Sequence, residues 1–321
     1  ISLIKGIDLS SLIIISLSTS CKLCSRALLS LITLSVDFSL IILFIYIFQI
    51  IILYYNSLIK YIKSLYNFIL RDIMYSMNRT VDNILKGKIS IIQLKHGFRF
   101  GFDAVFLAAF VNGFLQKYKK KDVSLADIGS GVGTISLIIA YKNEKIKLTA
   151  IENNNQYLEL AKENILNNNL KNQIKLLNSD IFKINKTLVN TFDIVVSNPP
   201  FYKEYKNRSK NKLENYAKVM KNLEQWINSS VKLLNSKGII FLIITSEILD
   251  LVLHHLREKT GSFKIFPFWP NYKKSSKRII LVARKGGASS TELMSGLKLY
   301  NKNGLMTKKA KMISEVGIFN Y

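Results

Sequence analysis

Four consecutive residues, Asn198-Pro199-Pro200-Phe201, combine groups that can hold a planar amine. The Asn198 side chain accepts hydrogen bonds through its oxygen and donates them through its nitrogen. The two prolines fix the backbone and remove two N–H donors, which leaves rigid carbonyl oxygens available as acceptors. The Phe201 ring offers a flat face for stacking. Two prolines alone are also typical of a structural turn, but their position directly after a predicted strand favours a site that grips an amine on a stacked ring.

A glycine-rich turn precedes this motif in the chain. It runs Asp127-Ile128-Gly129-Ser130-Gly131-Val132-Gly133-Thr134. Glycines permit a tight turn and let backbone N–H groups approach a ligand closely. The spacing differs from the G-x-G-x-x-G of dinucleotide sites. A carboxylate beside the turn would repel a pyrophosphate and would suit an ammonium group, so the turn favours a cofactor of that kind over a purely structural role.

Two further acids follow predicted strands. Glu152 could accept both hydroxyls of a ribose, as in other nucleotide-binding α/β folds. Asp180 could accept a hydrogen bond from an adenine amino group. The alternatives are an ordinary acid at a helix N-terminus for Glu152 and a helix cap for Asp180. Both readings stay open on the sequence alone.

Alternating strands and helices must position these residues. The patterns predict strands over 124–129, 147–152, 174–180, 192–197, 239–245 and 279–283, and helices over 134–141, 155–167, 219–234 and 247–259. Such alternation implies a doubly wound α/β domain whose largely parallel sheet is covered on both faces. Ligands of such folds bind beyond the carboxyl ends of the strands, and the four motifs above all follow strands.

The charge of the chain points to a polyanionic partner. The 321 residues carry a formal net charge of +25, and hydrophobic residues make up 49% of them, which excludes a disordered protein. A basic loop follows Phe201. We expect it to bind phosphates, although a solvated lysine-rich loop would look the same. Its basic residues are Lys203, Lys206, Arg208 and Lys210.

The first 73 residues differ from the rest. They contribute +3 of the net charge and residues 74–321 contribute +22. The apolar run 38–55 is long enough for a transmembrane helix. The segment also lacks Met, Glu, Pro and Trp, which favours upstream sequence read in frame with translation starting at Met74 or Met77. Cys21 and Cys24 have no second ligand pair, so no metal site is predicted and a disulfide-rich secreted domain is excluded.

Taken together, these motifs resemble those of class I S-adenosylmethionine-dependent N-methyltransferases with an N-P-P-[FY] signature. Three further segments make residues 78–321 similar to the tRNA(valine) adenine N6-methyltransferase family. They are 78–84, 97–105 and 268–286. The resemblance implies a Rossmann-like domain over residues 74–321, with a mostly parallel seven-stranded sheet and helices on both faces.

The resemblance also implies roles for individual residues. Asp127 and the glycines at 129, 131 and 133 would hold the methionine end of S-adenosylmethionine, Glu152 its ribose and Asp180 its adenine. Asn198 and the Pro199 carbonyl would bind the target amine, with Phe201 stacked on the base. Two residues of the 97–105 segment, Gly101 and Asp103, would line the cofactor pocket. Position 102 departs from the family pattern, because a Phe stands where a small residue or Thr is expected.

The function implied is methylation of an adenine in tRNA, just 3′ of the anticodon, by a cytoplasmic enzyme with no metal and no obligate protein partner. A membrane location would require residues 1–73 to be translated. Two alternatives use the same Asn-Pro-Pro-aromatic device: methylation of a protein glutamine at N5, and methylation of a guanine N2 in ribosomal RNA. A third is a membrane-tethered RNA-binding module without activity.

Overall fold

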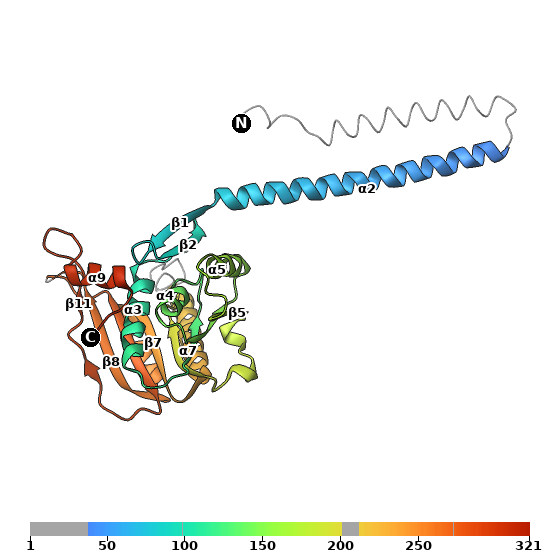
Figure 1. Ribbon diagram of the computed structural model, residues 1–321. Coiled ribbons are helices and arrows are strands. Elements are labelled where there is room, and N and C mark those ends of the chain that lie inside the picture. The colour runs from blue at the N-terminus through green and yellow to red at the C-terminus, as the bar shows by residue number, and fades with distance from the viewer. Residues whose placement is uncertain (1–37, 98, 201–211, 272) are drawn as a thin grey trace. The chain divides into compact units, whose positions relative to one another are not determined.

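The structure is a computed structural model that describes residues 38–97, 99–200, 212–271 and 273–321 (Figure 1). Residues Asn78–Tyr321 form one compact unit. Of the other unit, Ile1–Met77, the structure describes the helix α2 (Phe38–Met77).

Helix α2 carries the apolar run of the N-terminal segment. Its described side chains are mostly exposed, including Leu53 and Tyr54. Within the described part of the chain, no helix is both long enough and apolar enough to cross a membrane. The predicted span 38–55 lies partly outside the described residues, because the side chains of 38–42, 44, 45 and 48 are not described. Cys21 and Cys24 also lie outside them.

The compact unit is built on one mixed sheet with the strand order β10-β8-β9-β7-β6-β3-β4-β5, and β11 pairs with β8. All neighbours from β7 to β5 are parallel, whereas β9 runs antiparallel to both β7 and β8. The strands are β3 (Ser124–Ile128), β4 (Lys147–Glu152), β5 (Ile174–Asn178), β6 (Phe192–Ser197), β7 (Leu234–Thr245), β8 (Thr260–Trp269), β9 (Arg278–Lys285), β10 (Glu292–Leu293) and β11 (Leu297–Lys298).

The predicted seven-stranded, mostly parallel sheet is confirmed in its core. Seven strands of this sheet have five or more residues, and the two-residue strands β10 and β11 extend it beyond the prediction. The strand β8 is not among the predicted strands, although it pairs with β9 over most of its length. Its Pro267 obscures the strand pattern, because proline is typical of edges and interruptions of strands.

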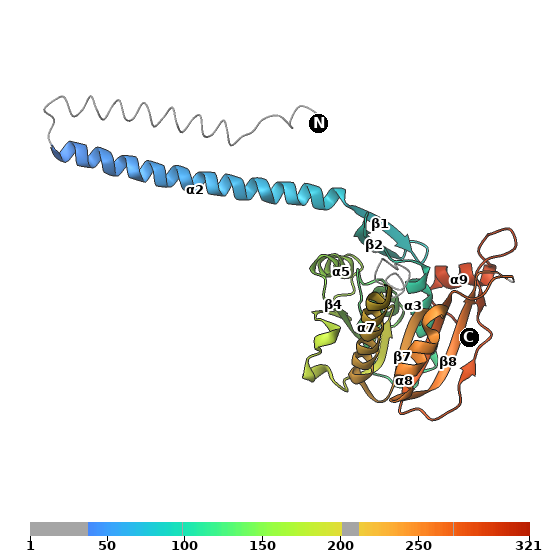
Figure 2. The same ribbon diagram turned by 180° about the vertical axis from the view of Figure 1, so that it is seen from behind.

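Helices cover both faces of the sheet (Figures 1 and 2). Strand β7 shows why, since its alternate side chains point to opposite faces. The Phe241 ring packs 5.2 Å from the ring of Phe114 on one face. Ile240 and Leu242 join the core cluster of the other face. The helices are α3 (Phe102–Lys117), α4 (Thr134–Lys142), α5 (Asn155–Asn167), α7 (Lys212–Leu233), α8 (Leu249–Arg257) and α9 (Lys308–Val316).

The compact unit begins with a hairpin of β1 (Arg79–Ile84) and β2 (Ile89–Leu94). Hydrogen bonds join this hairpin to α5 and to Asn168, the residue directly after α5. The Asn164 amide accepts from the Ile92 N–H at 2.7 Å and donates to the Ile92 carbonyl at 2.9 Å. Asn168 makes the same pair of bonds with Ser90. These two amides pair with the backbone N–H and C=O groups along one edge of β2. Asn164 also donates to the carbonyl of Val132, which lies in the glycine-rich turn before α4, so the hairpin is fixed close to that turn.

Candidate functional site

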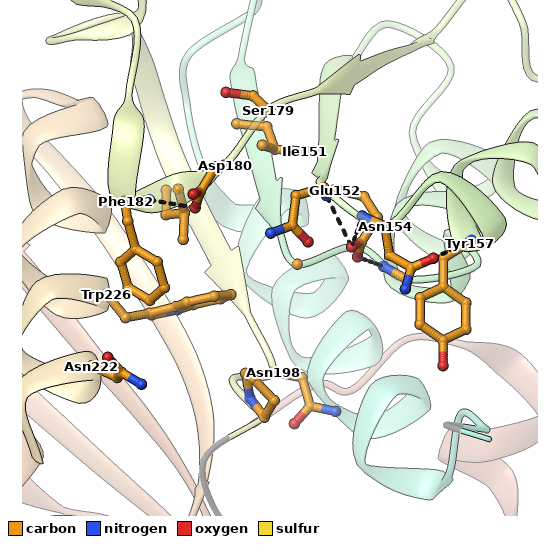
Figure 3. A pocket seen from close by; sticks show the side chains of 15 residues that line it. Ile151, Glu152, Asn154, Tyr157, Ser179, Asp180, Phe182, Asn198, Asn222 and Trp226 are labelled. Carbon is orange, nitrogen blue, oxygen red and sulfur yellow. Dashed lines mark hydrogen bonds between the residues drawn. The ribbon is translucent and has the colours of Figure 1, made fainter. Parts of the chain in front are cut away.

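A cavity of about 380 Å³ opens at the carboxyl ends of β3, β4, β5 and β6 (Figure 3). This is the edge at which parallel α/β sheets bind ligands. Six of the predicted site residues line it: Gly129, Gly131, Glu152, Asp180, Asn198 and Pro200. The fold therefore gathers residues from four separate strand ends into one cavity.

The glycine-rich turn forms one wall. Its three glycines have positive φ angles, 67° at Gly129, 56° at Gly131 and 88° at Gly133, a backbone region that other residues rarely adopt. Gly133 is also the N-cap of α4, so the turn leads directly into a helix N-terminus. A Cβ at Gly131 would meet no atom within 4 Å, which leaves its backbone open to a ligand.

The Glu152 carboxylate is held in place at the end of β4. One of its oxygens accepts from the Gly131 N–H at 2.8 Å. The other accepts from the N–H groups of Asn153 and Asn154, both at 2.9 Å. Glu152 is 9% exposed and lines the cavity, and each carboxylate oxygen can accept more than one hydrogen bond. It can therefore bind the hydroxyl groups of a ligand without reorganising.

Asp127 lies beneath the turn and is not among the residues that line the cavity. It is fully buried, and its carboxylate accepts from the Ser136 N–H at 3.1 Å and from the Ser136 hydroxyl at 2.7 Å. Burial raises the pKa of Asp127 to about 7, and the nearby charge of Glu152 acts in the same direction. In this structure Asp127 ties the glycine-rich turn to the first turn of α4 through Ser136.

Three polar atoms around the turn lack a hydrogen-bond partner among the described residues. They are Oδ1 of Asp127 and the side-chain hydroxyls of Ser130 and Thr134, all of them buried. Unpartnered buried polar atoms are rare in folded proteins. Three of the eight such atoms among the described residues lie at this one turn.

Asp180 has the helix-capping role that was one of its two predicted readings. Its carboxylate accepts from the Phe182 N–H at 2.9 Å and so caps the short helix η1 (Ile181–Lys183). The same residue lines the cavity. The cap fixes the Asp180 side chain at the cavity wall, and a hydrogen bond from an adenine amino group to it stays a prediction.

The Asn-Pro-Pro motif follows β6 as predicted. Asn198 is half-buried and lines the cavity together with Pro200, whereas Pro199 is buried behind them. Figure 3 shows Asn198 on the side of the cavity opposite Ser179. Phe201 lies outside the described residues, as do Lys203, Lys206, Arg208 and Lys210 of the predicted phosphate-binding loop.

Gly101 and Asp103 lie elsewhere. Gly101 is the N-cap of α3 and lines a different hollow, of about 520 Å³, beside the β1–β2 hairpin. The Asp103 carboxylate pairs with the Arg278 guanidinium at 2.6 Å. Neither residue is among the described residues that line the 380 Å³ cavity, and their contact with the cofactor stays a prediction.

Aromatic residues that the sequence reading missed complete the cavity. The Trp226 ring, from α7, forms its floor, with the Phe182 ring 6.1 Å away at 71°. The indole N–H donates to the Ser197 hydroxyl at 3.2 Å, and that hydroxyl donates to the Ile128 carbonyl at 2.9 Å. In the sequence Trp226 reads as an ordinary core position of an amphipathic helix, and no local signal separates the two roles.

Tyr157 and Asn222 also line the cavity, from the first turn of α5 and from α7 (Figure 3). Both offer polar groups at its rim. Among the described residues, no three His, Cys, Asp or Glu side chains lie close enough together to hold a metal ion. The site thus offers carboxylates, backbone N–H groups, amides and three aromatic rings, which suit a ligand with hydroxyl groups and a flat ring system.

Comparison with known proteins gives the same picture. Residues 108–265 match the family model described as "Methyltransferase small domain". A relative from Histophilus somni named "tRNA1(Val) (adenine(37)-N6)-methyltransferase" is 27% identical over 227 residues, which are 69% of this chain and 90% of the relative. A relative of the same name from Flavobacterium psychrophilum is 28% identical over 159 residues, 49% of this chain and 65% of the relative.

A solved structure shares the fold. It is a "predicted O-methyltransferase" from Agrobacterium tumefaciens, with a TM-score of 0.55 at 19% sequence identity, and the match covers 67% of this chain and 97% of that one. At this identity the likeness concerns the fold, in which the cavity described above lies at the carboxyl edge of the sheet.

Proposed function

Because the chain belongs to the class I S-adenosylmethionine-dependent methyltransferases, we propose that it methylates the exocyclic N6 amine of an adenine in tRNA, at position 37 of valine tRNA. One observation carries the proposal: Glu152, Asp180 and Asn198 line the same cavity. A nucleoside cofactor and an amine can therefore meet in one place.

The cavity fits S-adenosylmethionine. Its volume of about 380 Å³ is in the range of small-molecule sites. Glu152 offers a fixed carboxylate to ribose hydroxyls, Asp180 an acceptor to the adenine amino group, and Trp226 and Phe182 aromatic surface to the adenine ring. The unpartnered hydroxyls of Ser130 and Thr134 lie in the turn that would surround the methionine end. When bound, the cofactor supplies an electrophilic methyl group.

Asn198 acts on the other reactant. The lone pair of an adenine amine is delocalised into the ring, which makes the amine a poor nucleophile. The Asn198 oxygen and the Pro199 carbonyl would accept its two N–H groups, draw the nitrogen toward tetrahedral geometry and stabilise the positive charge that forms on it. Rigid prolines hold these acceptors in place, so the amine is oriented before transfer. The product cation loses a proton easily, and no strong base is needed before transfer.

The choice of tRNA rests on charge and on the relatives. Residues 74–321 carry a formal net charge of +22, which suits a polyanion. The relatives that match most of this chain bear the name of a tRNA adenine-N6 methyltransferase. An adenine in an anticodon loop is already unpaired, so less free energy is needed to place it in a cavity.

The test uses purified protein, S-adenosylmethionine labelled on its methyl group, and three acceptors: unmodified valine tRNA, ribosomal RNA and a release factor. We expect label in the tRNA, recovered as N6-methyladenosine at position 37. Label in guanine of ribosomal RNA, or in a glutamine of the release factor, would contradict the proposal. Valine tRNA with guanine at position 37 is the matched control and should remain unlabelled.

A further inference from the structure

The carboxyl edge of the sheet continues past Asn198 to a second set of residues. In the strand register, Ser197 of β6 lies beside Leu242 of β7, and Thr245 at the end of β7 lies beside Arg278 at the start of β9. Arg278 in turn lies beside Phe268, near the end of β8. The loop that joins β8 to β9 is therefore at the same edge as Asn198, on the side away from the cofactor cavity.

This loop is basic and is fixed to the end of β7. Lys273, Lys274 and Lys277 are all exposed, and none of the three pairs with a carboxylate in the described ranges. The Ser246 hydroxyl donates to the Ser276 carbonyl at 2.7 Å, and the Ser246 N–H donates to the Lys277 carbonyl at 3.3 Å. Residues 270–277 contain no acid, so the loop itself carries three positive charges and no negative one.

An exposed aromatic ring lies at the same corner. Phe102, the first residue of α3, is 52% exposed. The ion pair of the adjacent Asp103 with Arg278 joins the first turn of α3 to the start of β9, directly after Lys277. The Phe102 ring is 6.0 Å from the Phe106 ring, which packs 5.3 Å from the ring of Phe268 in β8. Phe102 thus extends a buried aromatic row out to the surface.

We propose that Phe102, Lys273, Lys274 and Lys277 form an RNA-docking surface that binds nucleotides flanking the target adenine. The inference rests on the proposed function and adds the residues that hold the RNA. Single-stranded RNA offers unstacked bases and a chain of phosphates, and proteins bind it with aromatic rings beside ammonium groups. Asp103 and Arg278 act as positioning residues, because their ion pair holds the ring and the loop on one side of the sheet edge.

The lysines are tested by a triple variant, Lys273→Ala, Lys274→Ala and Lys277→Ala. The matched control replaces Lys119, Lys121 and Lys145, three exposed lysines at the amino edge of the sheet. For an unmodified anticodon stem-loop RNA, we expect the first triple variant to raise KM at least tenfold with little change in kcat. The slope of log Kd against log salt concentration should fall by about 0.7 for each phosphate that the protein no longer neutralises. Equal effects of the two triple variants would overturn the inference.

The ring is tested by Phe102→Ala and Phe102→Trp. Removal of the aromatic ring that stacks on one base costs about 1–3 kcal/mol, so the Kd of the Ala variant for the RNA should rise about 5- to 150-fold. The Trp variant should keep the affinity of the native protein, because any large flat ring can stack. An Ala variant with native RNA affinity would overturn the role of Phe102. Cofactor affinity and melting temperature, measured for every variant, should stay at native values, which separates a docking defect from a folding defect.

Failure of this inference is distinct from failure of the proposed function. If the native protein methylates the RNA and the docking variants match their controls, only the docking surface is wrong. If the native protein methylates a release factor and no RNA, both proposals are wrong.

Discussion

The carboxyl edge of the sheet has two halves with opposite chemistry. Behind β3, β4 and β5, acidic side chains are buried or half-buried and bonded to backbone N–H groups, as at Asp127, Glu152 and Asp180. Beyond β7, the loop between β8 and β9 carries exposed lysines and no acid. Asn198 directly follows β6, the strand that lies between these two halves. One edge can thus hold a small cationic cofactor and a polyanion side by side without placing either against like charge.

The difference follows from how the strands are connected. In the cofactor half β3 and β4 are each followed by a crossover α-helix and β5 by the short helix η1, and these helices begin with N–H groups close to the cavity. In the other half β8 and β9 are antiparallel neighbours joined by a loop that has no helix. A turn fixed by a helix suits a small ligand of defined shape, whereas an open loop suits an extended strand of nucleic acid.

The largest effect on the reaction is expected from a change at Asn198, which lies between the two halves of the edge. Asn198→Ala should lower the rate of methyl transfer by about 100- to 1,000-fold, because the variant lacks an acceptor for the charge that forms in the transition state. Single-turnover kinetics measure this rate, and calorimetry should show cofactor affinity within a few-fold of native. Asn178→Ala is the control: Asn178 ends β5, bonds Asn155 at 3.0 Å and does not line the cavity. A rate for Asn198→Ala within threefold of the control would contradict the role of Asn198.

The buried acid of the cofactor half should make stability depend on pH. The native pKa of Asp127 is about 7 and its unfolded value is 3.8, so between these values the native state binds more protons than the unfolded state. Stability from this group is therefore full below pH 4 and is lost as pH rises to 7. The loss between pH 5 and pH 8 is about 3 kcal/mol.

Urea unfolding of native protein and of Asp127→Asn at each pH measures this loss as the difference between the two curves. The free energy of unfolding of the variant should lack this part of the decline. Asp250→Asn, at an exposed carboxyl on α8, should follow the native curve. An Asp127→Asn curve parallel to the native one would show that the buried carboxyl is not the source.

Changes in the acidic half of the edge should lower the affinity for the cofactor. Glu152→Ala removes a carboxylate that lines the cavity and accepts three backbone N–H groups. Hydrogen bonds to a charged group contribute about 1.5–3 kcal/mol, so cofactor Kd should rise about 10- to 100-fold. Glu159→Gln, at an exposed position of α5, should leave it unchanged. A Glu152→Ala protein with native cofactor affinity would mean that the two halves do not divide the ligands as proposed.

The smallest effect compares two glycines of one turn. Alanine at either position must adopt a left-handed backbone, at a cost of about 1–2 kcal/mol. At Gly129 the new Cβ would also lie 2.9 Å from the Trp226 ring, whereas at Gly131 it meets open space. The clash should cost about 1 kcal/mol more and lower the Tm of Gly129→Ala by about 2–4 °C below that of Gly131→Ala. Thermal unfolding without cofactor measures the difference. Equal Tm values would show that the Trp226 ring can move away from the new Cβ at no cost in stability.

The sequence predicts much of the fold and part of the site. Strand β4 and helix α5 have the predicted bounds, because alternation and helical periodicity are strong there. Helix α3 was missed: ten successive residues from Ala104 to Gly113 are buried, so no polar face marks it as a helix. For the cavity, Glu152, Asp180 and Asn198 could be found because each follows a strand, and in such a fold the strand ends converge.

What the sequence alone determined is therefore the alternation of strands and helices, the chemistry at the carboxyl ends of the predicted strands and the excess of positive charge. The tertiary structure decided which of those side chains reach the cavity. Asp127 is turned onto α4 and Trp226 is brought under Gly129, while Asp103 pairs with Arg278, 175 residues further along the chain. The reason is physical: local patterns follow from backbone geometry, but the direction of a side chain and its distant partners depend on how the layers pack.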